Sequence, residues 1–415
     1  MCNIKRLHLV ALLSGANFTA TIFTLYLLAN TISLQQVIIS QIIYAVASFV
    51  GEIPSGMISD KFGHKKTVIT GYATLMLSPI MMILAPSATT LYISQAFNGL
   101  AGSALSGSEE ALYYDSYQEE GRPKQDFTKF FSRYSSLPIL GFIIASIVSG
   151  ILLQLFDSES YIPIYLLNLI SSAATTIVAA TLVSTKKELE VIEENPISLL
   201  RNSWKTVRSS KILFSLAMFG LLSLNGEYFL RQTYQPFFQQ VGVLPLFMGV
   251  VLAVGSALNF LVVRYSYKLE KFMNLEHILL LHTLLQGFLF IALGMLGQPV
   301  GVVILFVLLF SMFNAQNPVV SDYVNSRIEP NRRATVLSTI SFVRQIGQTL
   351  IRFVYAILLG YIGVAHSYKI QGFYLVLGGL LGYWLLVKCG CTYKIPRHEP
   401  APLPTEVKQG GPFEL

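Results

Sequence analysis

The sequence has few charged residues. Asp, Glu, Lys and Arg make up only 12% of its 415 residues, whereas hydrophobic residues make up 53% and the mean hydropathy is +0.58. A soluble fold of this length has no interior large enough to bury so much apolar surface. The shortage of charge therefore excludes an ordinary soluble protein and predicts a chain that crosses a membrane several times.

Cysteine and the common enzyme motifs are equally scarce. Cys2, Cys389 and Cys391 offer no pair expected on an oxidising face and no metal-ligand array with histidine. The sequence contains no Gly-x-x-x-x-Gly-Lys-Ser/Thr nucleotide loop and no nucleophile motif. We therefore expect no metal, no cofactor, no ATP-driven pump and no enzyme.

Long apolar segments account for most of the chain. About 20 apolar residues cross roughly 30 Å of hydrocarbon as a helix, and the sequence divides into twelve such segments. They are expected at residues 7–29, 34–57, 67–86, 90–114, 129–154, 161–184, 211–235, 244–265, 276–296, 300–323, 335–360 and 369–388. The predicted fold class is an all-α integral membrane protein with twelve transmembrane helices.

The basic residues predict the orientation of these spans. An even number of spans returns both termini to one side, and nearly all of the 29 Lys and Arg residues fall in segments on that side. By the positive-inside rule both termini are expected in the cytoplasm, with the spans in the inner (plasma) membrane. The net charge of +7 then faces anionic membrane lipids, so no nucleic-acid partner is expected.

A short charged turn separates the second and third expected spans. Its sequence is Gly56-Met-Ile-Ser-Asp60-Lys61-Phe-Gly63-His-Lys65-Lys66. Gly56 permits close approach of a neighbouring helix, and Gly63 can take the positive φ of a tight turn. Asp60 is held near the membrane surface, where it can face a cation or the positive end of a helix dipole. The lysines alone would satisfy the positive-inside rule, but that rule requires neither Asp60 nor the glycines.

The pattern Gly-x-x-x-Asp-Lys/Arg-x-Gly-x-Lys/Arg-Lys/Arg resembles the loop between the second and third helices of the major facilitator superfamily of secondary transporters. The resemblance implies two pseudo-symmetric six-helix bundles around a central cavity, alternating access and a small-molecule substrate. The implied domains are a first bundle at residues 1–184, a cytoplasmic linker at 185–210, a second bundle at 211–390 and a disordered cytoplasmic tail at 391–415. We expect a monomer.

The resemblance extends to some motifs and not to others. Glu52-Ile-Pro54-Ser-Gly56 and Arg333-Ala-Thr335 resemble a bacterial subgroup of these transporters. Many relatives have an arginine in an Arg-x-x-x-Gly pattern on the fourth helix, whereas this chain has Gln95 four residues before Gly99. A proton-coupling scheme that uses this arginine therefore does not carry over. The fifth span also lacks the Gly-Pro-x-x-Gly-Gly signature of antiporter-type exporters.

Acidic and basic residues concentrate at the expected cytoplasmic ends of the spans. We interpret them as a cytoplasmic gate, and the alternative is a solvated charged rim. The gate set comprises Glu52, Gly56, Asp60, Lys61, Gly63, Lys65, Lys66, Glu109, Glu110, Asp115 and Arg333. Of these, Glu110 is expected to reach the cavity.

Charged residues inside spans are costly and are therefore candidates for function. Glu227 and Arg231 are one helical turn apart and can pair. Arg344, Gln348 and Arg352 repeat this spacing and form a polar stripe about 12 Å long. These five residues are predicted to bind substrate or to couple transport to protons. The alternative is a static ion pair that holds two helices together.

Neutral polar residues are also expected at the depth of the cavity. They are Asn17, Gln95, Asn98, Asn314 and Asn317. Their contribution would be hydrogen bonding, and the alternative for any one of them is a helix-packing amide.

Three functional hypotheses follow. The first is a secondary transporter, driven by a proton gradient, that moves an anionic or zwitterionic solute such as a carboxylate-rich metabolite or siderophore, because arginine binds carboxylates bidentately. The second is a broad-specificity drug/proton antiporter, for which Tyr72, Phe97, Tyr228 and Tyr234 would supply aromatic contacts. The third is a non-transporting membrane receptor or enzyme.

Overall fold

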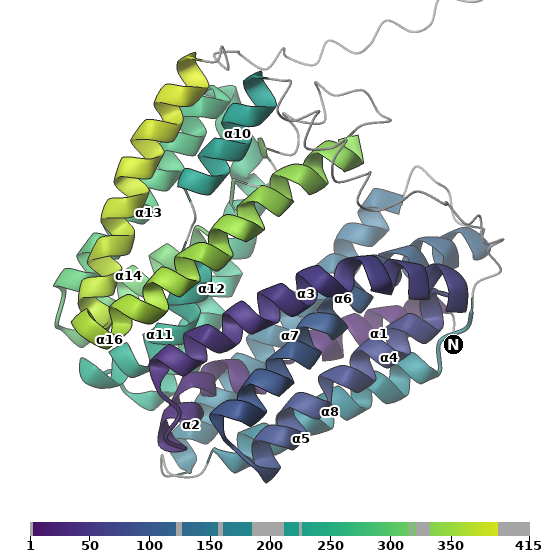
Figure 1. The fold of residues 1–415 in the computed structure, drawn as a ribbon. Coiled ribbons are helices and arrows are strands. Elements are labelled where there is room, and N and C mark those ends of the chain that lie inside the picture. Colours follow the sequence, from purple (N-terminus) through teal and green to yellow (C-terminus); the bar gives the residue numbers. More distant parts are fainter. Residues whose placement is uncertain are drawn as a thin grey trace, which may run out of the picture.

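The regular structure of the described part of the chain is helical. The computed structural model describes residues 3–121, 127–156, 161–184, 211–223, 226–313, 315–316, 319–320 and 333–388. Within these ranges no strand occurs. Figure 1 shows two groups of long helices, one formed by α1 to α8 and the other by α10 to α16.

The first group follows the six spans expected before the linker. Its elements are α1 (Asn3–Gly15), η1 (Phe18–Thr21), α2 (Phe23–Ala29), α3 (Leu34–Phe62), α4 (His64–Leu75), α5 (Leu77–Leu84), α6 (Ala88–Glu119), α7 (Phe127–Leu155) and α8 (Ile162–Ala180). The first expected span is broken, because Asn3–Thr21 and Phe23–Ala29 meet at an angle of 43°. Residues His64–Leu84 form one span of 21 residues despite the division between α4 and α5.

The second group follows the spans expected after the linker. Its elements are α10 (Lys211–Leu222), α11 (Glu227–Gln240), α12 (Pro245–Tyr265), η3 (Ser266–Lys271), α13 (Leu275–Met295), α14 (Pro299–Ser311) and α16 (Arg333–Lys388). The seventh expected span is interrupted before α11, where Gly226 has a φ of 32°. Glu227 therefore lies in the first turn of a helix and not in the middle of an unbroken span.

The eleventh and twelfth expected spans are two helices joined at a kink. α16 includes both, and its backbone leaves the helical conformation at Gly363, with φ 71° and ψ 177°. Figure 1 shows the green and yellow arms of α16 meeting at this bend. A glycine adopts such a backbone conformation at little cost, so a single residue reverses the chain where the sequence suggested a loop.

Seven helices of the described residues are long and apolar enough to cross a membrane, or eight if the bent pair of helices at the N-terminus forms one span. Large apolar side chains on their surfaces are exposed, including Ile170 at 63%, Leu350 at 64% and Leu377 at 67%. So much exposed apolar surface fits contact with lipid rather than water. The expected total of twelve spans is not reached by this criterion, since several expected spans are bent or only partly described.

Small residues allow the helices to pack closely. A Cβ at Gly99 of α6 would lie 2.4 Å from the carbonyl oxygen of Tyr44 on α3. A Cβ at Gly249 of α12 would lie 2.1 Å from the carbonyl oxygen of Ser146 on α7. The first contact holds the first group together, and the second brings the two groups into contact. Glycines at such crossings let helix backbones approach where a larger residue would separate them.

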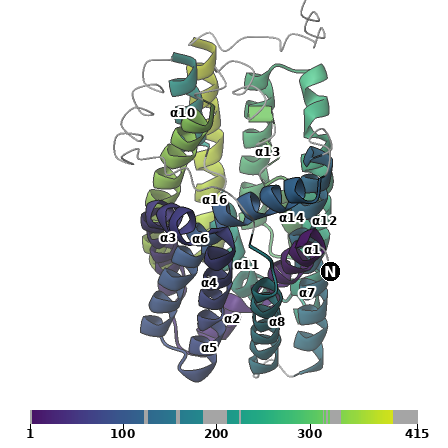
Figure 2. The same ribbon diagram turned by 90° about the vertical axis from the view of Figure 1, so that its right-hand side faces the viewer.

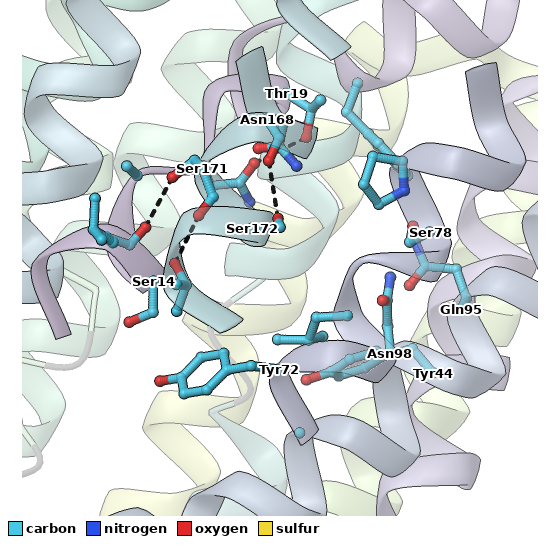
Figure 3. A pocket seen from close by; sticks show the side chains of 18 of the residues that line it. Ser14, Thr19, Tyr44, Tyr72, Ser78, Gln95, Asn98, Asn168, Ser171 and Ser172 are labelled. Atoms are coloured by element: carbon cyan, nitrogen blue, oxygen red, sulfur yellow. Dashed lines mark hydrogen bonds between the residues drawn. The ribbon is translucent and has the colours of Figure 1, made fainter. Parts of the chain in front are cut away.

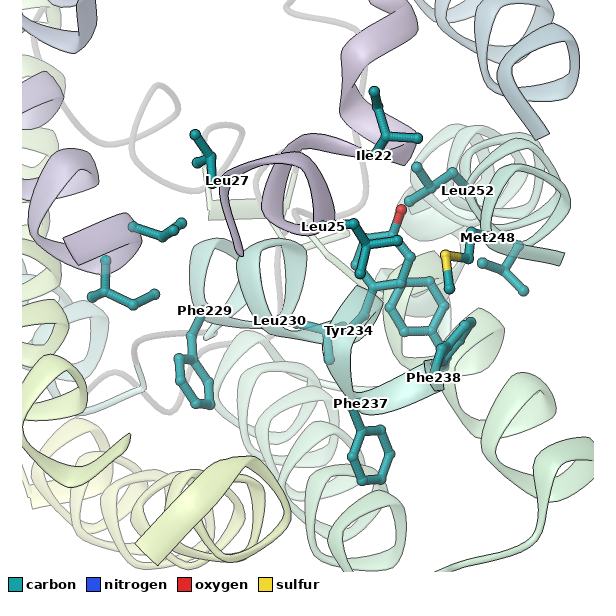
Figure 4. Packing of buried hydrophobic residues seen from close by; sticks show 14 of the residues in the cluster. Ile22, Leu25, Leu27, Phe229, Leu230, Tyr234, Phe237, Phe238, Met248 and Leu252 are labelled. Atoms are coloured by element: carbon teal, nitrogen blue, oxygen red, sulfur yellow. The ribbon is translucent and has the colours of Figure 1, made fainter. Parts of the chain in front are cut away.

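An apolar cluster also joins the two groups. Figure 4 shows Ile22 and Leu25, from the end of the broken first span, above Tyr234 and Phe238 of α11. Figures 1 and 2 both show α3 beside α16, and these helices are in contact. The two groups thus meet along α2 and α11, along α3 and α16 and along α7 and α12, beside a polar cavity.

Candidate functional site

A cavity of about 460 Å³ opens mainly within the first group of helices. Only Tyr228 and Gln232 of its lining come from the second group. Figure 3 shows two facing walls with tyrosine rings near one end of the cavity. The walls carry Ser78, Gln95 and Asn98 on one side and Asn168, Ser171 and Ser172 on the other.

The polar lining consists of uncharged amides and hydroxyls. The amides are Asn17, Gln41, Gln95, Asn98, Asn168 and Gln232. The hydroxyls are Ser14, Thr19, Tyr44, Tyr72, Ser78, Ser171, Ser172, Thr175 and Tyr228. Among the described residues, no aspartate, glutamate, lysine or arginine lines this cavity. Such a lining can donate and accept many hydrogen bonds but cannot neutralise a charge.

The break in the first span contributes to this cavity. The backbone N–H of Phe18 donates to Asn168 Oδ1 at 3.0 Å, and Ser149 Oγ donates to the Phe18 carbonyl at 2.8 Å. Ser171 Oγ donates to the carbonyl of Leu13 at 3.1 Å. Irregular backbone at membrane depth is tolerated where side chains satisfy it beside a cavity, and α7 and α8 provide those side chains here.

The structure places three of the five predicted neutral residues in the cavity wall. Asn17, Gln95 and Asn98 line it, whereas Asn314 and Asn317 lie outside the described residues. The sequence analysis missed Gln41, Asn168 and Gln232. Each is an amide inside an expected span. This property alone could have identified them as candidates, in the same way as Gln95 and Asn98.

Glu227 and Arg231 form the ion pair that their spacing predicts. Arg231 Nε and one terminal guanidinium nitrogen each lie 3.0 Å from Glu227 Oε1. The guanidinium also lies 4.5 Å from the centre of the Phe310 ring. It also lies 5.8 Å from the centre of the Phe142 ring of α7, in the first group. Neither residue lines the large cavity.

Arg352 lies behind the cavity wall. It is 6% exposed, and its guanidinium donates to the Gln41 carbonyl at 3.0 Å. The guanidinium also sits 4.0 Å from the centre of the Tyr228 ring. Arg352, Gln348 and Glu227 border a separate space of about 20 Å³. The side chain of Arg344 is outside the described residues, so the predicted polar stripe is described only at Gln348 and Arg352.

The predicted gate residues separate into several environments. Glu52, Lys61, Lys66 and Glu110 are exposed, and Lys65 is half-buried. Asp115 lies 3.9 Å from His64, while Gly63 turns the chain between α3 and α4 with a φ of 90°. The side chains of Asp60 and Arg333 and the surroundings of Gly56 are outside the described residues.

Glu110 was expected to reach the cavity, but its neighbour Glu109 is the one that contacts a residue of the cavity lining. Glu110 is exposed, because it points away from the helix face that packs on α4. Glu109 is on that face, and its Oε2 accepts a hydrogen bond of 3.0 Å from the hydroxyl of Tyr72, which lines the cavity. Tyr134 of α7 donates to the other carboxyl oxygen, Oε1. Two adjacent glutamates thus have opposite environments because they lie on different faces of α6.

The fold and the cavity match a known family. A family model for the Major Facilitator Superfamily matches residues 7–351. The chain belongs to this superfamily. The uncharacterized transporter YxaM of Bacillus subtilis (strain 168), described as of the same type, is 22% identical over 368 residues, which is 86% of this chain and 88% of that protein. An uncharacterized transporter of Buchnera aphidicola subsp. Acyrthosiphon pisum is 22% identical over 317 residues, 74% of this chain and 76% of that protein.

Solved structures of major facilitator transporters have the same fold. The nucleoside transporter NupG has a TM-score of 0.76 and 14% identity, with coverage of 93% of this chain and 99% of that one. A D-xylose-proton symporter has a TM-score of 0.72 and 13% identity, with coverage of 94% and 98%. At these identities the likeness shows the fold alone. Membership of the superfamily makes the protein a multi-pass membrane transporter for a small molecule and not an enzyme.

Proposed function

We propose that this transporter moves a small, neutral, hydrogen-bonding solute across the inner membrane by alternating access, driven by a proton gradient. The observation that carries the proposal is the uncharged character of the described part of the cavity lining, which includes six side-chain amides. A solute with several hydroxyl or amide groups can pair with each of them. A cavity of about 460 Å³ is within the range of roughly 300–1,000 Å³ that small-molecule sites occupy.

This proposal replaces the anionic or zwitterionic substrate that the sequence suggested. That prediction depended on arginines in the cavity, but Arg231 and Arg352 are outside its described lining, and the side chain of Arg344 is outside the described residues. A buried carboxylate without a cation is costly. The described lining therefore favours a neutral solute over a carboxylate-rich one. The printed names of two structural neighbours, a nucleoside transporter and a D-xylose-proton symporter, are compatible with this choice.

The lining gives less support to drug efflux. Of the four aromatic residues considered for a drug site, Tyr72 and Tyr228 line the cavity. Phe97 is exposed on α6, and Tyr234 is buried in the apolar cluster between the two groups. A lipophilic cation would also lack a carboxylate in the described lining. The geometry therefore favours polar over amphipathic cargo.

We also propose that the structure is the inward-facing state. The two groups are held together by hydrogen bonds of α11. Gln235 Nε2 donates to the Ala20 carbonyl and Gln235 Oε1 accepts from the Thr24 N–H, while the Thr24 hydroxyl donates to the Gln232 carbonyl. If both termini are cytoplasmic, as the basic residues predict, this closed end faces outward. The cavity then exchanges solute with the cytoplasm.

The proposal is tested by solute uptake into liposomes that contain the purified protein. Labelled uridine, D-xylose, succinate and a lipophilic cation are compared. We expect flux of a neutral solute, and we expect Gln95→Ala and Asn98→Ala to weaken its apparent affinity about 3- to 10-fold. This range corresponds to the loss of about 0.5–1.5 kcal/mol per hydrogen bond.

Gln118→Ala is the matched control, because Gln118 is an exposed glutamine on the same helix and is outside the cavity lining. It should transport like the wild type. Flux of succinate or of the cation without flux of either neutral solute would contradict the proposal. Equal effects of Gln95→Ala and Gln118→Ala would show that the cavity is not the solute site.

A further inference from the structure

Glu109 is a half-buried carboxyl group held by two phenols. Tyr72 of α4 donates a hydrogen bond of 3.0 Å to Oε2, and Tyr134 of α7 donates to Oε1. Among the described side chains, no lysine or arginine forms an ion pair with Glu109. Binding of a solute by the cavity lining does not by itself require this carboxyl group.

The Tyr72 hydroxyl links Glu109 to the cavity. Tyr72 is 4% exposed and lines the cavity, as does Ser14 of α1. The Ser14 hydroxyl donates to the Ala11 carbonyl at 3.0 Å. Figure 3 shows Ser14 and Tyr72 near the same edge of the cavity. The Tyr72 hydroxyl therefore connects the cavity directly to a carboxyl group behind its wall.

The surroundings of Glu109 contain few other ionisable groups. His8 of α1 meets the ring edges of Tyr134 and Tyr113 at centroid distances of 5.9 and 5.8 Å. Its Nδ1 lies 2.7 Å from the carbonyl of Ile4. Asp115, further along α6, lies beside His64 of α4.

From α3, which also packs on α6, the side chain of Asp60 is outside the described residues. Among the described side chains, those that form hydrogen bonds with the carboxyl group are Tyr72 and Tyr134.

We propose that Glu109 is the proton-binding site of this transporter and that the Tyr72 hydroxyl connects its protonation to the solute cavity. This inference rests on the proposed proton-driven transport of a neutral solute and assigns the proton to a residue. Tyr72 passes its hydroxyl hydrogen to Oε2 and takes one proton from a hydronium ion in the cavity, which is left as water. The phenol is unchanged at the end, and one proton has moved from the cavity to the carboxyl group.

Protonation changes what Tyr72 offers to the cavity. An ionised carboxylate only accepts, so the Tyr72 hydrogen points to Glu109, away from the cavity. A protonated carboxyl donates one hydrogen bond, and Tyr72 then accepts it. The Tyr72 hydrogen is free to turn toward Ser14 or toward a solute. The proton and a hydroxylated solute therefore favour each other's binding, which is the requirement for coupling.

Infrared titration tests the proton site without any solute. We expect purified wild-type protein to show the carbonyl stretch of a protonated carboxyl that appears as pH falls. The band should be absent in Glu109→Gln and altered in Tyr72→Phe. Glu110→Gln is the matched control, because it removes the adjacent, exposed carboxyl, and it should leave the band unchanged. A band that persists in Glu109→Gln would overturn the assignment.

Transport tests the coupling. For whichever of uridine or D-xylose is carried, we expect Glu109→Gln to lose accumulation driven by a pH gradient by at least about tenfold. Counterflow, in which labelled and unlabelled solute exchange without net proton movement, should change less than about threefold. Tyr72→Phe keeps the aromatic ring and should also lose coupled accumulation.

Coupled accumulation that survives in Glu109→Gln or in Tyr72→Phe would refute this proposal. Absence of flux for both solutes in the wild type would instead refute the proposed function, and the infrared result would then decide the proton site by itself. If Glu109→Gln does not fold, Tyr72→Phe decides the coupling.

Discussion

At the scale of single residues, Gln235 shows how one neutral side chain can hold two halves of a transporter together. It is fully buried, and its Oε1 accepts from the backbone N–H groups of Thr24 and Leu25 at 2.8 and 3.2 Å. Its Nε2 donates to the carbonyl of Ala20 at 2.8 Å. These backbone groups are left without helical partners by the bend before α2. A side chain with one acceptor and one donor satisfies both kinds of group at once.

Replacement of Gln235 should weaken the closed end. Gln235→Leu has a similar volume but leaves buried backbone groups unsatisfied, at about 1–3 kcal/mol each. We expect a lower thermal unfolding midpoint and faster labelling of Asn98→Cys by a membrane-impermeant maleimide added outside intact cells. Gln239→Leu, at an exposed position of the same helix, is the control. Unchanged labelling with a lowered midpoint would show that Gln235 supports stability but not the closed state.

At the scale of secondary structure elements, the described helices are less regular than the apolar segments that predict them. The first span bends between η1 and α2, the seventh is interrupted before α11, and α16 bends at Gly363. Apolar length fixes where a helix crosses the membrane. It does not reveal a break, because the partners that stabilise a break come from other helices.

The bend of α16 should depend on glycine. At φ 71° and ψ 177° a residue with a Cβ is strained by about 1–3 kcal/mol. Gly363→Ala should therefore lower the thermal unfolding midpoint, although no atom lies within 4 Å of the added Cβ. Gly297→Ala is the control, since it also has open space but no positive φ. If both variants unfold at the same temperature, backbone strain at Gly363 is not significant.

At the scale of the whole molecule, transport requires the two groups of helices to separate where they now touch. A Cβ at Gly360 of α16 would lie 1.9 Å from Gln35 Nε2 on α3. The end of the Gln35 side chain therefore reaches α16, and cysteines at the two positions lie on opposite sides of the contact between the two groups. A covalent bond at this point should prevent the outward opening that alternating access needs.

We expect oxidation of Gln35→Cys/Gly360→Cys, with the three native cysteines replaced by serine, to stop transport and a reducing agent to restore it. Gly51→Cys/Ser103→Cys is the matched control, because the Cβ at Gly51 would lie 3.3 Å from that of Ser103 within the first group. This second bond should form without loss of flux. Transport that continues through a complete Gln35–Gly360 cross-link would exclude separation of α3 and α16.

The membrane class, the family and the approximate position of the helices can be predicted from the amino-acid sequence alone. These depend on local properties: apolar length, the charged turn around Asp60 and the spacing of residues such as Glu227 and Arg231. The pairing of those two residues followed from one turn of helix and is present in the structure. Local patterns suffice for these properties because lipid offers no hydrogen-bond partners, so most backbone N–H and C=O groups of a span must pair within its own helix.

Which polar residues share a cavity depends on how the helices pack in three dimensions. Gln95 and Asn98 were foreseen there, but Asn168 and Gln232 join them from distant helices. Arg352 was expected in the cavity and lies behind its wall, against Tyr228. Likewise Glu109, and not Glu110, contacts Tyr72. The physical reason is that the surroundings of a side chain depend on which helix packs against its face. That packing depends on the bends and crossings of other helices.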